Sequence, residues 1–169
     1  MRRRRWLKLG LGAAALLALA GGGAVAVTEP GLRAGRLTAA GRRVFDRVGR
    51  AFLDGSLPTE PVQQREAMQA FLVRVDALTS ALPTHAQQEL SQLLALLATG
   101  AGRRLLASLD VPWPEADLSR IQAALQSMRT SPLALKQQAY HALHDITGAA
   151  YFSDPSTWAV LGYPGPVAV

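Results

Sequence analysis

The sequence predicts an all-α protein: a compact domain of about five to six helices, preceded by an N-terminal signal or anchor helix and followed by an extended tail rich in proline and aromatic residues. Apolar residues recur at three- and four-residue steps through most of the chain, which is the spacing of one helix face. No stretch alternates between apolar and polar residues over the length of a strand. Prolines and glycines stand between the periodic segments, where helices end.

Residues 1–26 have the pattern of a twin-arginine signal peptide or anchor, S/T-R-R-x-F-L-K. Arg3 and Arg4 take the paired positions. Trp6 and Leu7 take the apolar pair, and Lys8 is the final base. The pattern predicts export of the chain through the twin-arginine translocase.

The apolar run that follows, residues 9–27, contains 19 residues without a charge and is rich in glycine and alanine. Ala24 and Ala26 satisfy the small-x-small rule for signal peptidase, so we expect cleavage before Val27. An uncleaved anchor in the membrane stays open, because this run could just span a bilayer. In both cases the arginines keep the N-terminus cytoplasmic, and the rest of the chain is expected in the periplasm or on the periplasmic face of the inner membrane.

The charge balance gives no reason to expect nucleic-acid binding. Of 18 basic residues, five precede the apolar run, and the remaining 13 face 12 acidic residues. Most of the basicity therefore belongs to the signal, and no nucleic-acid partner is expected. The chain has no cysteine, which excludes disulfides, iron–sulfur clusters, covalent haem attachment and thiol catalysis.

Residues 27–35, with Pro30, read as a linker, and residues 36–150 as the helical domain. The first helix should end near Gly55, and its four arginines are expected on a solvated face. The second helix should be capped by Thr59 and end at Pro83. The apolar stripes of these two helices are Leu37, Val44, Val48 and Phe52, then Met68, Phe71, Leu72, Val75, Leu78 and Leu82.

The next helix should begin with a capping box formed by Thr84 and Gln87 and stop at Gly100. A short helical piece over 103–109 follows, and Ser131-Pro132 should open the last long helix. The buried stripes of these helices are Leu90, Leu93, Leu94 and Leu97, then Leu118, Ile121, Leu125 and Met128, and finally Leu135, Ala139, Leu143 and Ile146.

Residues 151–169 form a tail of different character. Asp154-Pro155-Ser156 can start one short helix that carries Trp158 and Leu161. The following run, residues 162–166 (Gly-Tyr-Pro-Gly-Pro), cannot be helix or central strand. Such a tail either docks into a groove on another protein or folds back over its own helices, and the residues alone leave both open.

His141, His144 and Asp145 are the one constellation that resembles a reactive site. Histidines at i and i+3 share a helix face, but the i,i+4 pair and the glutamate base of a zincin helix are absent. We expect capping, packing or partner contact, with a small metal-dependent enzyme as a remaining option. No nucleophile elbow or phosphate loop occurs, so no catalytic, cofactor-binding or metal-binding residue is assigned.

The C-terminal stretch resembles the signature of the small (gamma-type) subunits of bacterial periplasmic FAD-dependent sugar and polyol dehydrogenases, such as sorbitol, glucose and gluconate dehydrogenases. The residues that carry the resemblance are Tyr140, Ala142, Leu143, Asp145, Thr147, Tyr151, Pro155, Trp158, Gly162, Tyr163, Pro164, Gly165 and Pro166. The central helices show no alignable motif.

This resemblance implies a non-catalytic accessory subunit without a cofactor of its own. FAD would belong to a large partner subunit of the glucose–methanol–choline (GMC) oxidoreductase type, and electrons would pass onward through that subunit or a cytochrome c subunit. The small subunit would carry the export signal for the large one. The expected partner interface consists of Tyr151, Pro155, Trp158, Gly162, Tyr163, Pro164, Gly165 and Pro166, bordered by His144 and Asp145. The alternative is a stand-alone, membrane-anchored helical binding or scaffold protein of the cell envelope.

Overall fold

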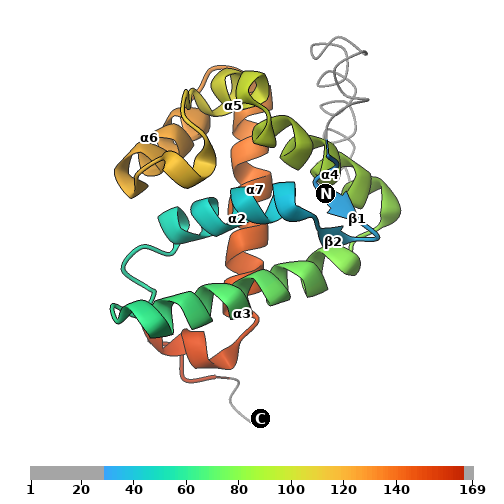
Figure 1. The fold of residues 1–169 in the computed structure, drawn as a ribbon. Helices are drawn as coiled ribbons and strands as arrows, with labels where there is room; N and C mark the ends of the chain where they lie inside the picture. The colour runs from blue at the N-terminus through green and yellow to red at the C-terminus, as the bar shows by residue number, and fades with distance from the viewer. Residues whose placement is uncertain (1–28, 166–169) are drawn as a thin grey trace.

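The computed structural model describes residues 29–165. The predicted export signal, its cleavage site and Pro166 lie outside the described residues. The described part is compact and mostly helical, which confirms the predicted fold class for this region (Figure 1). Its six α-helices are α2 (Ala39–Phe52), α3 (Pro61–Ser80), α4 (Thr84–Ala98), α5 (Gly100–Ala107), α6 (Leu118–Arg129) and α7 (Ala134–Phe152). No helix in this part of the chain is long and apolar enough to cross a membrane.

A short β-hairpin precedes the helices, where the sequence predicts only a linker. Strand β1 (Leu32–Arg33) pairs antiparallel with β2 (Arg36–Leu37), and Leu32 lies opposite Leu37. Both leucines are buried, so the folded domain begins before residue 36. Two-residue strands are too short for an alternating pattern to be visible in the sequence.

Helix α2 lies at the centre of the domain and contacts α3, α4, α6 and α7 (Figure 1). Thr38 caps it, with its hydroxyl accepting a hydrogen bond from the Gly41 amide. Val44, Phe45 and Val48 are fully buried. Each such side chain contributes about 1.5–3 kcal/mol through removal from water. The other predicted stripes also face the core, except Leu118, which is 39% exposed at the first position of α6.

Four predictions about helix ends are wrong. Helix α3 is capped by Glu60 rather than Thr59: the Glu60 carboxylate accepts from the Gln63 amide at 2.8 Å. The proposed box at the start of α4 does not form. Pro83 occupies the cap position there, and the Gln87 side chain donates to the Leu82 carbonyl at 2.9 Å.

Gly100 begins α5 instead of ending α4. The hydroxyl of Thr99 caps α5 by accepting from the Gly102 amide at 3.0 Å, so the two helices are separated by this single residue. Ser131 likewise precedes the last long helix rather than opening it. Its hydroxyl accepts from the Leu133 amide at 3.2 Å, and α7 begins at Ala134.

A buried carboxylate that the sequence pattern does not reveal joins the hairpin to two helices. Asp76 of α3 accepts the Leu37 amide at 2.7 Å and pairs with the guanidinium of Arg42 on α2. The arginines of α2 are therefore not simply a solvated face. Arg47 also donates to the Pro114 carbonyl, and Arg50 pairs with Asp46 at 3.3 Å.

Candidate partner-docking surface

The C-terminal segment continues from α7 into a short 3-10 helix, η3 (Pro155–Leu161). Asp154 caps η3: its carboxylate accepts the Ser156 amide at 3.0 Å and the Ser156 hydroxyl at 2.8 Å. These hydrogen bonds from Ser156, together with the positive charge of Arg74, lower the pKa of Asp154 below its usual value. The predicted short helix beginning at Asp154-Pro155-Ser156 is confirmed.

Tyr151, predicted as part of the interface, lies instead in the packed part of the domain. It occupies the last turn of α7, where its ring is buried. Its hydroxyl donates to the Ser56 carbonyl at 2.8 Å and so ties α7 to the loop between α2 and α3. Burial raises the pKa of the Tyr151 hydroxyl. In this conformation the Tyr151 side chain packs inside the domain and is not exposed for contact with a partner.

Trp158 and Tyr163 form the aromatic part of the tail surface. The half-buried Trp158 donates its indole N–H to the Phe152 carbonyl at 2.8 Å. Tyr163 stands beside it, with ring centroids 5.4 Å apart, and remains 48% exposed. The chain turns between them at Gly162, which has a φ of 66°. This left-handed conformation favours glycine and turns the chain after η3.

The remaining described tail residues belong to the same candidate strip. Pro155 and Pro164 are exposed. Gly165 has a φ of 102° and lies beside the Trp158 ring, where an added Cβ would be 3.6 Å from the ring. As far as residue 165 the tail therefore contacts the end of α7 and still exposes Tyr163 and Pro164 to solvent. Figure 1 shows this segment beneath α3, at the end of α7.

His144 and Asp145 lie on α7 in a second aromatic group. The His144 ring stacks on Tyr140 at 5.7 Å and meets the edge of Phe52 at 5.3 Å. Its Nδ1 lies 3.1 Å from an Asp145 carboxylate oxygen, and both side chains are exposed. No hydrogen bond or ring contact within residues 29–165 joins this pair to the segment after Asp154. The structure thus places the two predicted parts of the interface in separate groups.

The metal-site alternative has no geometric support in the described chain. His141 meets Tyr140 edge-on at 5.5 Å rather than sharing a centre with His144. Among residues 29–165 there is no group of three or more His, Cys, Asp or Glu side chains that could hold a metal ion.

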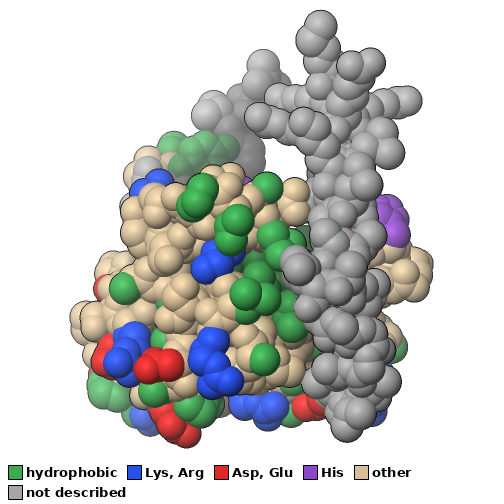
Figure 2. All heavy atoms as spheres, turned by 90° about the horizontal axis from the view of Figure 1, so that it is seen from above, with side chains coloured by type: hydrophobic (Ala, Val, Ile, Leu, Met, Phe, Trp, Pro, Cys, Tyr) green, Lys and Arg blue, Asp and Glu red, His purple; other side chains and the backbone are tan. Residues whose placement is uncertain are grey.

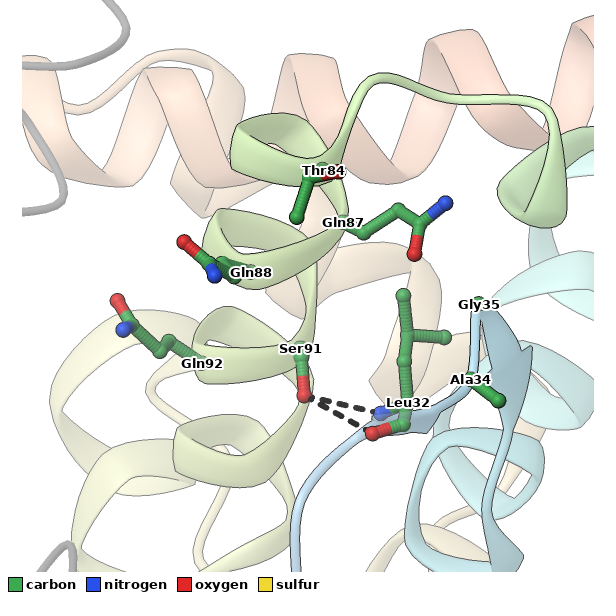
Figure 3. Close-up of a pocket in the computed structure, with 8 residues that line it drawn as sticks. All are labelled: Leu32, Ala34, Gly35, Thr84, Gln87, Gln88, Ser91 and Gln92. Atoms are coloured by element: carbon green, nitrogen blue, oxygen red, sulfur yellow. Dashed lines mark hydrogen bonds between the residues drawn. The ribbon is translucent and has the colours of Figure 1, made fainter.

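A shallow depression of about 290 Å³ lies between the hairpin and α4 (Figure 3). Its lining is Leu32, Ala34, Gly35, Thr84, Gln87, Gln88, Ser91 and Gln92. The Ser91 hydroxyl is already bonded to the backbone of Leu32, and the Gln88 and Gln92 side chains point away from the hairpin. None of the lining residues carries a charge, so the depression offers no acid, base or charged anchor for a reaction.

The face of the domain seen in Figure 2 carries basic and acidic side chains side by side, with hydrophobic side chains between them. On this face the described residues form no continuous basic surface. This agrees with the charge balance of the sequence after the signal.

Arg74 of α3 is the functional candidate that sequence reasoning missed. Its guanidinium donates to the Ala150 carbonyl at 2.9 Å and to the Asp154 carboxylate at 3.1 Å. An arginine between core positions of an amphipathic helix reads as an ordinary surface residue. Its partner Asp154 is 80 residues away in the sequence, so the pair becomes visible only in the folded structure.

Comparisons with known proteins identify no relative: no family model, no curated protein and no solved structure matches this chain.

Proposed function

We propose that this chain is the non-catalytic small subunit of a periplasmic FAD-dependent, GMC-type sugar or alcohol dehydrogenase. It escorts the catalytic subunit through twin-arginine export and stabilises it. The supporting observation is the coincidence of two features in one segment. Residues 138–166 carry the pattern that resembles the family, and the end of the described part, residues 158–165, forms an aromatic strip at the surface.

The strip has the chemistry of a protein-binding surface. Aromatic side chains are enriched at the centres of interfaces, where a large ring is buried at small entropic cost. Tyr163 exposes such a ring, and the Trp158 ring packs against it. Pro164 follows directly, and proline restricts the backbone before any partner arrives.

The export pattern points in the same direction. The twin-arginine route is generally used by proteins that fold around a cofactor before transport. A signal of this kind on an accessory chain has a simple explanation if the cofactor travels on a bound passenger. FAD on the large subunit would supply the hydride chemistry, with a cytochrome c as a further member of the complex.

The test is affinity capture of the tagged full-length chain from its native envelope, followed by an absorption spectrum. We expect a large flavin-containing subunit to co-purify. Tyr163→Ala should weaken capture, and truncation after Ser153 should abolish capture and partner export. Leu133→Ala is the matched control, because Leu133 is also exposed, at 58%, but lies at the opposite end of α7.

A colourless chain that captures no flavoprotein would contradict the proposal. So would a truncated chain that still delivers active dehydrogenase to the periplasm. The first result would favour the alternative of a stand-alone, membrane-anchored scaffold protein.

A further inference from the structure

The end of α7 and the start of η3 are held by one side chain from another helix. Arg74 of α3 is only 21% exposed, and its two hydrogen bonds reach Ala150 and Asp154 together. Within residues 29–165, no other side chain from outside the segment 154–165 forms a hydrogen bond to it. The segment's own side chains bind it to α7, through the Thr157 hydroxyl to the Tyr151 carbonyl at 3.1 Å and the Trp158 indole to the Phe152 carbonyl at 2.8 Å. Among the described residues, Arg74 adds the side-chain hydrogen bond that joins the segment to a helix other than α7.

Hydrogen bonds inside the segment link Asp154 to the backbone that carries the exposed Tyr163 ring. Asp154, held by Arg74, accepts two hydrogen bonds from Ser156. The buried Thr157 hydroxyl donates to the Asp154 carbonyl at 2.7 Å. The Tyr163 amide then donates to the Trp158 carbonyl at 3.2 Å, which fixes the backbone beneath the Tyr163 ring. A continuous chain of contacts thus leads from α3 to the tip of the tail.

We propose that Arg74 is a positioning residue that holds η3 and residues 162–165 in the conformation that docks, so that the partner meets a preformed surface. This inference rests on the proposed function, because it concerns the same segment and the same large subunit. A seven-residue 3-10 helix has poor intrinsic stability and needs tertiary contacts to stay in place. Without Arg74 the segment keeps its hydrogen bonds to α7 but loses its side-chain hydrogen bond to α3, so other conformations of η3 should become more populated.

The size of the effect follows from the populated fraction. The apparent dissociation constant equals the intrinsic constant divided by the fraction of molecules in the docking conformation. If loss of Arg74 lowers this fraction to about a tenth, the dissociation constant rises about tenfold.

The experiment compares the tagged full-length wild type with the variants Arg74→Gln, Arg74→Lys and Arg50→Gln. Arg50→Gln is the matched control: Arg50 is 26% exposed and also pairs with an aspartate, Asp46, within α2. Three quantities are measured for each: the affinity for the captured flavoprotein, the thermal midpoint, and amide hydrogen exchange at Gly162 and Tyr163, whose amides bond to Ala159 and Trp158.

We expect Arg74→Gln to weaken partner affinity about tenfold and to speed exchange at both amides, and Arg50→Gln to do neither. Arg74→Lys should recover part of the affinity, since an ammonium can pair with Asp154 but lacks the planar fork that reaches Ala150 as well.

If the wild type binds the flavoprotein and Arg74→Gln binds it equally well, the positioning role is wrong while the proposed function stands. Unchanged exchange at the two amides also refutes it. The positioning role is also refuted if both Arg74→Gln and Arg50→Gln lose affinity in proportion to their loss of thermal midpoint, because the loss then reflects overall stability. If the wild type captures no flavoprotein, the proposed function itself fails and the docking role of Arg74 fails with it.

Discussion

Replacing Asp76 by alanine should release the hairpin from helices α2 and α3. The Asp76 carboxylate is buried and accepts the Leu37 amide at 2.7 Å. Its loss leaves a largely buried N–H without a partner, at a cost of about 1–3 kcal/mol. Arg42 is 43% exposed, so water can replace most of its pairing, which adds less than about 1 kcal/mol. We therefore expect the free energy of unfolding to fall by about 1–4 kcal/mol.

The assay is urea unfolding of the full-length chain followed by far-ultraviolet circular dichroism. Asp76→Asn keeps an oxygen that can accept from Leu37 and should cost less, about 1 kcal/mol. Asp46→Asn breaks an i,i+4 pair with Arg50 near the surface and should cost less than about 0.5 kcal/mol. If Asp76→Ala is no more destabilising than Asp46→Asn, the attachment of the hairpin does not depend on this carboxylate.

Three further predictions concern single positions. Gly31→Ala should lower the thermal midpoint by several degrees, because the new Cβ would clash with the Leu94 side chain on α4; an unchanged melting curve would contradict this close approach. Tyr151→Phe should cost about 1 kcal/mol in urea unfolding, since the Ser56 carbonyl loses its donor, and should leave partner capture intact. Ser156→Ala should raise the pKa of Asp154 towards 3.8, which carboxyl NMR titration measures. Folding lowers this pKa, so the ionised carboxylate stabilises the native state fully at pH values above its unfolded pKa. This stabilisation is lost as the pH falls through the pKa of the folded state.

The position of Tyr151 changes how the tail should be read. A tyrosine in a proline- and aromatic-rich tail reads as an exposed anchor, yet this ring is buried and its hydroxyl bonds to Ser56. Helix α7 continues to Phe152, beyond the point at which the composition of the sequence changes. Mutations at Tyr151 should therefore be interpreted through stability, and those at Tyr163 through binding.

The helix caps show where local sequence rules reach their limit. Thr59, Thr84 and Gly100 each fit a capping or stop rule, and each does something else in the structure. Glu60 accepts the capping hydrogen bond of α3 and Thr99 that of α5, whereas the start of α4 has no side-chain cap. Cap rules identify a boundary within a residue or two, and the tertiary arrangement selects which side chain forms the hydrogen bond.

The helical periodicity by itself determined the all-α class, most of the buried stripes and the short helix after Asp154, because those features depend on residues a few positions apart. Contacts between distant segments were decided only by the tertiary structure. Asp76 meets Leu37 across 39 residues, and Arg74 meets Asp154 across 80. A charged residue on a helix carries no local mark of such a partner, since the direction in which it points depends on how the helices pack. The candidate docking strip is therefore visible in the sequence, and the arginine that holds it is visible only in the fold.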